Sequence, residues 1–253
     1  MSTPSASAST LFVSDLHLDE RRPEATERFL RFLKEEARHA LALYILGDLF
    51  EFWIGDDVSS GLSDEVADGI ADLATAGTPV YFTHGNRDFM LGSEYAQRCC
   101  MTLLPEEQVI DLYGQPTLVL HGDQLCTDDT VYQAIRQQVR NPEWQAAMMA
   151  KSPAERMAFA RQAREQSRDH QQGIEEIIMD VNSDAVMDAL ARNDVRLMIH
   201  GHTHRPAFHE LSLGSDRARR IVLSDWYAQG SVLKATQGSC SLENLIFATH
   251  ENG

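Results

Sequence analysis

The chain has 253 residues, of which 43% are hydrophobic and 24% charged, and its formal net charge is −16. The length fits one large domain or one domain with an insertion. The acidic balance argues against a nucleic-acid partner, because such partners are bound by basic surfaces. No apolar run approaches the roughly 20 residues that are needed to span a bilayer.

Short apolar runs alternate with helical patterns, which predicts an α/β fold for residues 10–253. The polar stretch before them predicts a disordered tail over residues 1–9 rather than a secretory signal. Buried strands are expected at residues 10–15, 42–48, 117–123 and 196–202, and a further one is expected to end near Thr83. β-Type segments are expected near residues 221–223, 231–235 and 242–247. Helices are expected at residues 23–39, 64–76 and 183–192. Residues 128–172 interrupt this alternation with helical patterns, which we interpret as an inserted helical lid.

The four cysteines show neither a disulfide framework nor zinc-ribbon spacing. We therefore expect reduced thiols and a cytoplasmic location. Residues 131–170 carry seven basic side chains against four acidic ones. A solvated helical face is the simplest interpretation of that local excess.

Polar side chains follow five of the predicted strands, just past the point where each apolar run ends. They are Asp15, Asp48, Asn86, His121 and His202. Ligands of open α/β sheets bind at this edge. We therefore expect these side chains to share one crevice.

The surrounding motifs D-x-H, G-D, G-N, H-G-D and G-H-T-H predict a metal site. Any one of them more often serves as a turn or a cap, and only the combination in this order is informative. They supply two carboxylates, one amide and four imidazoles: Asp15, His17, Asp48, Asn86, His121, His202 and His204. Seven ligands are too many for one tetrahedral ion but suit two ions that share a bridging group. Mixed nitrogen and oxygen donors favour Mn²⁺, Fe²⁺ or Zn²⁺ over Ca²⁺.

These motifs resemble the pattern of the calcineurin-like metallophosphoesterase superfamily, D-x-H, G-D, G-N-H-[ED], H, G-H-x-H. The resemblance implies an αββα sandwich, with the helical lid inserted into it. It also implies one metal on Asp15, His17, Asp48 and His204, and a second on Asp48, Asn86, His121 and His202, with Asp48 bridging. His200 has no counterpart among these ligands, and we expect a strand-end role for it beside them.

The sequence departs from that pattern at Arg87, where the superfamily has a histidine that often donates a proton. Arginine cannot donate a proton at neutral pH, so an alkoxide leaving group would be poorly served. A phosphate leaving group is stable as an anion and needs charge neutralisation, which a bidentate arginine provides. Arg87 therefore favours cleavage of a diphosphate, although it could instead form only a salt bridge with Asp88.

Longer stretches resemble the family of lipid A-pathway pyrophosphatases of Gram-negative bacteria from Leu11 to about Val232. They are GDLFEFWIGDD, HGNRDF, DLYG with LHGDQLCTDD, and IHGHTHRP. The resemblance implies hydrolysis of UDP-2,3-diacylglucosamine at the α-phosphorus, giving UMP and 2,3-diacylglucosamine 1-phosphate (lipid X). It implies a hydroxide activated by two Mn²⁺ per chain, with Asp48, Arg87 and His202 as catalytic residues. Peripheral attachment to the cytoplasmic face of the inner membrane is implied as well, and we expect a monomer.

Only some of the substrate-binding positions of that family have the same residue type in this sequence. Asn86, Arg87, Asp129, Ser167 and His202 match in type. Gln171 stands where asparagine is frequent, and Ile174 stands where lysine is frequent. The isoleucine removes a headgroup or phosphate contact unless Arg164 or Arg168 replaces it.

The lid also carries apolar side chains, which either line a groove for acyl chains or only pack the lid on the main domain. They are Val131, Ile135, Trp144, Met148, Met149, Met157 and Phe159. Basic residues beside such a groove suit an anionic lipid surface.

Two other functions remain open at this point. A general nucleotide pyrophosphatase or cyclic-nucleotide phosphodiesterase would share the metal site but would not need an apolar lid. A scaffold that keeps only the fold would lose metal ligands, whereas every ligand position is filled in this sequence.

Overall fold

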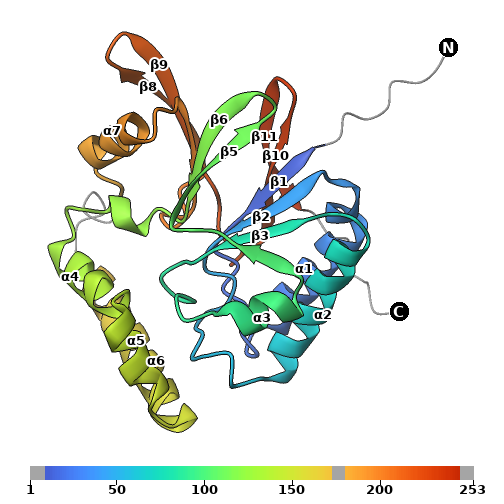
Figure 1. The fold of residues 1–253 in the computed structure, drawn as a ribbon, viewed down its shortest axis with the longest axis vertical. Helices are drawn as coiled ribbons and strands as arrows, with labels where there is room; N and C mark the ends of the chain where they lie inside the picture. The colour runs from blue at the N-terminus through green and yellow to red at the C-terminus, as the bar shows by residue number, and fades with distance from the viewer. Residues whose placement is uncertain (1–8, 173–179, 246–253) are drawn as a thin grey trace.

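The computed structural model describes residues 9–172 and 180–245, whose strands form two mixed sheets (Figure 1). The first sheet has, in spatial order, β11 (Ser239–Leu245), β10 (Gly230–Thr236), β1 (Thr10–Val13), β2 (Ala42–Leu46), β3 (Val80–Thr83) and β4 (Met101–Leu103). Strands β1 to β4 are parallel, and β10 pairs antiparallel with both β1 and β11. Of the predicted tail over residues 1–9, all but Ser9, which is buried, lies outside the described residues.

The second sheet has, in spatial order, β5 (Glu107–Leu112), β6 (Gln115–Leu120), β7 (Leu197–His200), β9 (Asp216–Val222) and β8 (Ala207–Leu213). Its central strands β6, β7 and β9 are parallel, and the edge strands β5 and β8 are antiparallel to their neighbours. Because the central strands of each sheet are parallel, the carboxyl ends of several strands lie together at one edge of that sheet.

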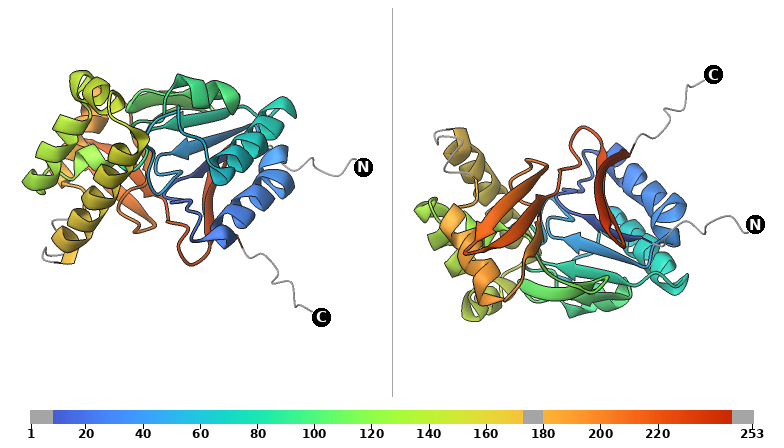
Figure 2. Two further views of the ribbon diagram at one scale, coloured as in Figure 1. Left: turned by 90° about the horizontal axis from the view of Figure 1, so that it is seen from below. Right: turned by 90° about the horizontal axis from the view of Figure 1, so that it is seen from above.

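Helices cover the outer faces of the two sheets (Figures 1 and 2). Beside the first sheet lie α1 (Pro23–Glu35), the short 3₁₀ helix η1 (Ala37–His39), α2 (Gly61–Thr75) and α3 (Ser93–Arg98), and beside the second lies α7 (Ser183–Arg192). The core accordingly falls into three apolar clusters. One joins the first sheet to its helices, one joins the two sheets, and one joins the second sheet to α7. The predicted αββα sandwich is confirmed.

Strand β1 shows how the sequence builds these layers. Leu11 and Val13 belong to the cluster beneath the helices, whereas Phe12 between them packs between the two sheets. Successive side chains of a strand point to opposite faces, so a strand covered on both faces needs a continuous apolar run. The run TLFV meets that need.

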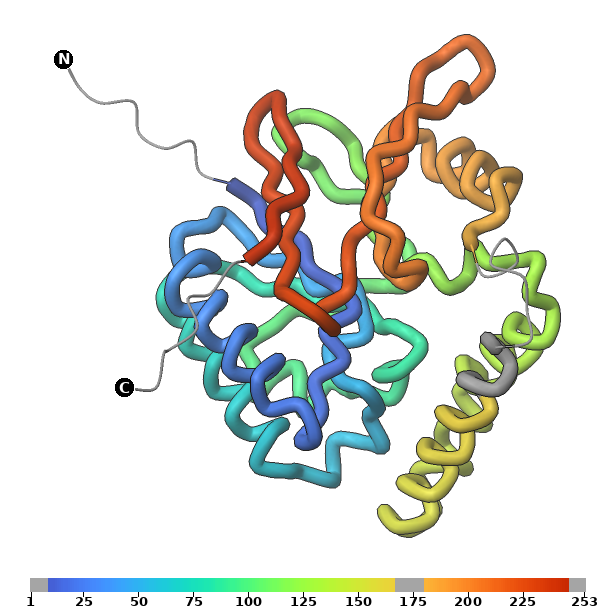
Figure 3. The backbone as a smooth tube through the Cα atoms, turned by 180° about the vertical axis from the view of Figure 1, so that it is seen from behind, coloured from blue at the N-terminus to red at the C-terminus, as the bar shows by residue number. Residues whose placement is uncertain are grey.

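Three helices follow β6 and the 3₁₀ helix η2 (Asp123–Leu125). They are α4 (Thr130–Val139), α5 (Pro142–Met149) and α6 (Pro153–Gln172). Together we call them the helical insertion. Figures 1 and 3 show it beside the sandwich rather than over either sheet. None of the helices in the described part of the chain combines the length and the apolar character that crossing a membrane requires.

Candidate metal centre

The predicted ligands lie at the carboxyl ends of five strands. Asp15 lies two residues after β1, Asp48 two residues after β2 and Asn86 three residues after β3. His121 follows β6 directly, and His202 lies two residues after β7. The first three come from one sheet and the last two from the other. The predicted ligands, which we call the cluster, therefore lie where the two sheets meet.

One group of potential ligands consists of Asp15, His17 and His204, whose donor atoms all lie within 4.8 Å of one another. His204 Nε2 is 3.2 Å from Asp15 Oδ1 and 3.4 Å from His17 Nε2. Burial opposes ionisation of Asp15, but the adjacent His204, His121 and His17 outweigh it and hold its pKa well below the usual range. The carboxylate is therefore charged in the folded protein.

A second group consists of Asp15, Asp48 and His121. Asp48 Oδ2 lies 3.8 Å from the Nε2 atoms of both His17 and His121, so Asp48 stands between the two groups. Asn86 extends this second group, because its Oδ1 is 3.0 Å from His121 Nε2 and 3.0 Å from His202 Nδ1. The structure thus brings all seven predicted metal ligands together.

The imidazoles are oriented by contacts on their far sides. His121 Nδ1 lies 2.8 Å from the carbonyl oxygen of Leu46, and His17 Nδ1 lies 3.4 Å from Glu51 Oε2. In both rings Nε2 is the nitrogen that faces Asp48, the arrangement that outer contacts give to metal-ligating histidines. This partly buried set of nitrogen and oxygen donors fits divalent transition metals.

The backbone at these positions is strained. Among the non-glycine residues that the structure describes, five of the predicted ligands have a positive φ between 49° and 68°: Asp15, His17, Asp48, His202 and His204. Left-handed backbone of this kind costs an L-residue about 1–2 kcal/mol. Such strain persists only where the surroundings impose it, and it is typical of functional sites.

The backbone also passes close to the Asp15 carboxylate at Gly201. A Cβ atom built there would lie 2.3 Å from Asp15 Oδ2 and 2.2 Å from Ser14 Oγ. Only glycine lets the chain pass between these oxygens, and the next N–H, of His202, donates to Asp15 Oδ2 at 2.9 Å.

Arg87 and Asp88 both lie in the described part of the chain, and they form no salt bridge with each other. Asp88 is buried and accepts instead from the backbone N–H groups of Gly85, Leu49 and Asp48, at 2.9, 2.7 and 3.3 Å. Its burial and the nearby Asp48 raise its pKa. Arg87 Nε is buried without a hydrogen-bond partner among the described residues. The alternative that Arg87 only forms a salt bridge with Asp88 is therefore wrong.

His200 lies outside both groups of potential ligands. Its Nδ1 is 2.8 Å from the carbonyl oxygen of Gly201, and its Nε2 is 3.2 Å from the guanidinium of Arg220. Burial and the arginine lower the pKa of His200 to about 3, so it is neutral. It supports the turn that carries His202 and His204.

The predicted substrate-binding residues divide between the cluster and the helical insertion. Asn86 and His202 lie in the cluster, and the backbone N–H of Arg87 donates to Asp48 Oδ1 at 2.8 Å. Asp129 caps α4 by accepting from the backbone N–H of Tyr132 at 2.9 Å. The side chains of Ser167 and Gln171, and the whole of Ile174, lie outside the described residues.

Several residues at the site were missed by sequence reasoning. Tyr132 stacks on His202, with ring centroids 5.9 Å apart, and its hydroxyl donates to Asp123 Oδ2 at 2.8 Å. Tyr227 stacks on His17, with ring centroids 5.1 Å apart. The H-G-D motif pointed to the neighbourhood of Asp123, but no local pattern signals the two tyrosines, because their contacts are tertiary.

Four of the seven basic residues in the helical insertion turn toward the main domain, which corrects the expected solvated basic face. Arg136 pairs with Asp123 and Glu106, and Arg140 pairs with Glu106. The other two ion pairs are Arg156–Asp57 and Arg164–Glu51. These arginines therefore fasten the insertion to the sandwich.

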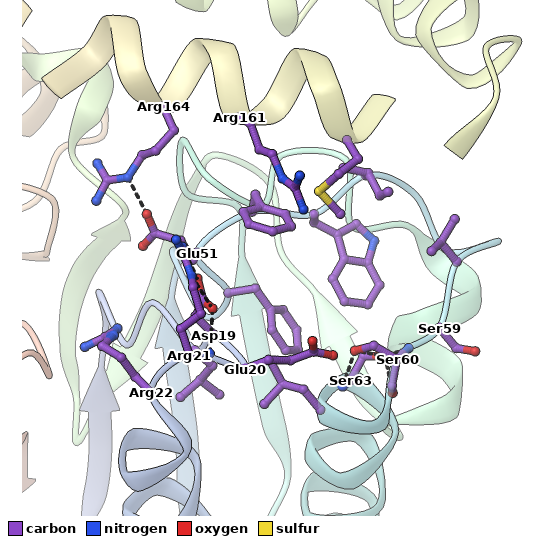
Figure 4. A pocket seen from close by; sticks show the side chains of 18 of the residues that line it. Asp19, Glu20, Arg21, Arg22, Glu51, Ser59, Ser60, Ser63, Arg161 and Arg164 are labelled. Carbon is purple, nitrogen blue, oxygen red and sulfur yellow. Dashed lines mark hydrogen bonds and ion pairs between the residues drawn. The ribbon is translucent and has the colours of Figure 1, made fainter. Parts of the chain in front are cut away.

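Two cavities border the cluster beneath α6. The larger, of about 640 Å³, lies between α6 and the loops that follow β1 and β2 (Figure 4). The smaller, of about 70 Å³, reaches Asn86 and Arg87 and is otherwise mainly apolar. Residues 51–54 and Arg164 line both cavities, so the Glu51–Arg164 ion pair lies where the two cavities meet.

Comparison with known proteins identifies the family. Residues 8–206 match the family model of calcineurin-like phosphoesterases. Three relatives named UDP-2,3-diacylglucosamine hydrolase come from Stenotrophomonas maltophilia (strain K279a), Serratia proteamaculans (strain 568) and Cellvibrio japonicus (strain Ueda107). They are 52%, 50% and 51% identical over 93%, 94% and 93% of this chain, and over 98%, 99% and 98% of their own lengths. The cluster of aspartates and histidines thus stands in a chain that belongs to the calcineurin-like phosphoesterase family.

Proposed function

We propose that this chain hydrolyses the diphosphate bond of UDP-2,3-diacylglucosamine in lipid A synthesis, giving UMP and 2,3-diacylglucosamine 1-phosphate. The name shared by relatives at about 50% identity supports the substrate. The observation that carries the chemistry is the buried cluster of potential metal ligands, with Arg87 beside Asp48. The protein is a metal-dependent hydrolase of a phosphorus anhydride.

We propose that the cluster binds two divalent ions, with Mn²⁺ as our first choice. The first ion would be held by Asp15, His17, Asp48 and His204. The second would be held by Asp48, Asn86, His121 and His202, which makes Asp48 the shared ligand. Bound ions supply a water activated toward hydroxide and neutralise charge on the phosphoryl oxygens.

Residues of the chain position the α-phosphorus and the leaving group. His202 has its pKa lowered to about 4 by burial and by the nearby His121, so it stays neutral and offers a lone pair. Arg87 stabilises the negative charge that develops on the departing sugar phosphate. Its buried Nε, without a hydrogen-bond partner among the described residues, is available for that contact.

The apolar cavity beneath α6 is our candidate site for an acyl chain. Its lining includes Phe89, Met148 and Phe159, and Trp144 lies against both phenylalanines. The cavity is narrow, so an acyl chain would have to part these side chains. Met148 is unbranched and suits such rearrangement.

The helical insertion also supports peripheral contact with the cytoplasmic face of the inner membrane. Val131, Ile135, Met149 and Phe159 are exposed apolar side chains of this insertion. Apolar side chains that insert into a lipid interface give contact of this kind. We propose that the protein acts there as a monomer.

The test is product analysis with the Mn²⁺-loaded protein, UDP-2,3-diacylglucosamine and, as a control without acyl chains, UDP-glucose. We expect UMP and the diacyl sugar phosphate from the lipid substrate, and little UMP from UDP-glucose. Efficient cleavage of UDP-glucose would make the protein a general nucleotide pyrophosphatase instead. Absence of cleavage of both would refute the proposed substrate.

A further inference from the structure

The larger cavity beneath α6 adjoins the first group of potential ligands. Tyr227, Glu51 and Arg22 line it, and each of them also contacts His17. Tyr227 stacks on the imidazole, Glu51 lies 3.4 Å from Nδ1, and Arg22 donates to the backbone carbonyl. A molecule in this cavity therefore lies next to the cluster, and its volume of about 640 Å³ suits a small ligand.

The walls of this cavity combine cationic, hydroxyl and aromatic groups with aliphatic side chains such as Ile54 and Met157. Arg161 projects from α6 into it, and Ser59 lies on the opposite side (Figure 4). Arg161 has no ion-pair or hydrogen-bond partner within the described ranges of the chain. Phe52 and Trp53 supply aromatic walls, which this cavity shares with the smaller one. A pyrimidine nucleoside needs such groups, because its base stacks on aromatic or guanidinium planes and its oxygens accept hydrogen bonds.

An acyl chain suits this cavity less well. It would cover the unpaired Arg161 and the ion pair of Arg21 with Asp19, which also lines the cavity. Covering a guanidinium with hydrocarbon removes its water and offers no hydrogen bond in return. The smaller cavity also has charged lining residues, but its Arg156 and Arg164 are held in ion pairs with Asp57 and Glu51. Its Phe89 and Phe159 offer an apolar surface for the chain.

The two cavities meet at the Glu51–Arg164 ion pair, and the proposed substrate has two unlike halves joined by a diphosphate. We infer that the larger cavity binds the uridine nucleotide half, with Arg161 as a specificity-determining contact. This inference rests on the proposed function and adds to it the place of the nucleotide. The lipid half then extends past Asn86 and Arg87 into the smaller cavity.

The test measures equilibrium binding of UMP to the Mn²⁺-loaded protein by calorimetry. Arg161→Ala should weaken UMP binding on the order of tenfold, as expected for loss of a charge-assisted hydrogen bond. Ser59→Phe, at an exposed position, should also weaken it by filling the cavity. Lys151→Ala is the matched control, because Lys151 is an exposed cation of the same insertion that lines neither cavity, and it should bind UMP as the parent protein does.

Binding of 2,3-diacylglucosamine 1-phosphate is measured with the same proteins and should change less than twofold in all of them. The inference is overturned if Arg161→Ala and Ser59→Phe bind UMP normally. It is also overturned if they lose affinity for the lipid product instead, because the cavity then serves an acyl chain. Turnover of UDP-2,3-diacylglucosamine by the unaltered protein separates these results from failure of the proposed function, which would appear as no turnover at all.

Discussion

Gly85 lies so close to Asp48 that a Cβ atom built on the glycine would stand 2.0 Å from Oδ1 of the carboxylate. The loop after β3 therefore passes directly against the residue that stands between the two groups of potential ligands. Any larger side chain at Gly85 must displace Asp48, because the glycine also lies against the backbone nitrogen of that residue.

Gly85→Ala should therefore strongly lower activity while the protein stays folded. We expect kcat to fall by two orders of magnitude or more, since small displacements of catalytic groups have effects of that size. The measurement combines kcat with the metal content of the purified variant. Gly61→Ala is the control, because a Cβ atom at Gly61 meets no heavy atom within 4 Å. Normal activity in Gly85→Ala would show that Asp48 need not stay in place.

His204 provides a test of backbone strain, because its φ is +55°. In metal-free protein, His204→Gly should be more stable than His204→Ala by about 1 kcal/mol, since only glycine adopts this conformation at low cost. Urea unfolding with a chelator present measures the difference. At Lys151, which is not among the positive-φ residues, glycine should give no such advantage. Equal stability of the two His204 variants would contradict the strain.

Asp57 should contribute to stability only where it is ionised. Its hydrogen bond to Arg156 lowers its pKa, so its contribution is complete above the unfolded pKa of about 3.9 and is lost as the pH falls through the lower folded value. Asp57→Asn should lower the free energy of unfolding by about 1 kcal/mol at most at pH 7, because Arg156 is buried but the Asp57 carboxylate is half exposed and screened by solvent. Urea unfolding from pH 8 downward should show the gap constant to about pH 5 and closing below about pH 4.

Asp68→Asn is the control for that experiment, since Asp68 is largely exposed and lies 3.6 Å from Arg98. Its effect should stay within about 0.5 kcal/mol at every pH. The difference in free energy of unfolding between Asp57→Asn and the unaltered protein should depend on pH. A difference that stays constant would show that the Asp57–Arg156 ion pair does not hold α6 on the main domain.

Arg87→Ala should lower kcat by a factor of about 10²–10³ without changing the metal content, because the guanidinium acts on the leaving group and not on the ions. Arg87→Lys should restore part of the loss, since lysine keeps the charge but not the paired donors. Steady-state kinetics and metal analysis of both variants test this. A variant that lost metal in proportion to activity would place Arg87 in the metal site instead.

Sequence reasoning predicted the parts of the fold that are buried and apolar. The strand that carries Asp15 is covered on both faces, and its apolar run is visible in the sequence. In contrast, β8 alternates half-buried and exposed side chains, and β9 begins with the charged run DRARR, so the first was missed and only the end of the second was predicted. The predicted helix at residues 64–76 begins earlier, at Gly61, because Ser60 and Ser63 form a capping box.

The metal ligands were predictable because each sits in a short motif at a strand end. The roles of Tyr132, Tyr227 and Glu51 were not, because each depends on a contact between segments distant in the sequence. The arginines of the insertion illustrate the same limit. Their number is visible in the sequence, but their partners Asp57 and Glu51 are set by the way α6 packs.

The most direct test of the account is hydrolysis of UDP-2,3-diacylglucosamine in water enriched in ¹⁸O, followed by mass spectrometry of both products. Attack at the α-phosphorus predicts one ¹⁸O in UMP and none in 2,3-diacylglucosamine 1-phosphate. Label in the sugar phosphate would contradict the account, because the nucleophile would then have attacked the other phosphorus and the nucleotide would have been the leaving group.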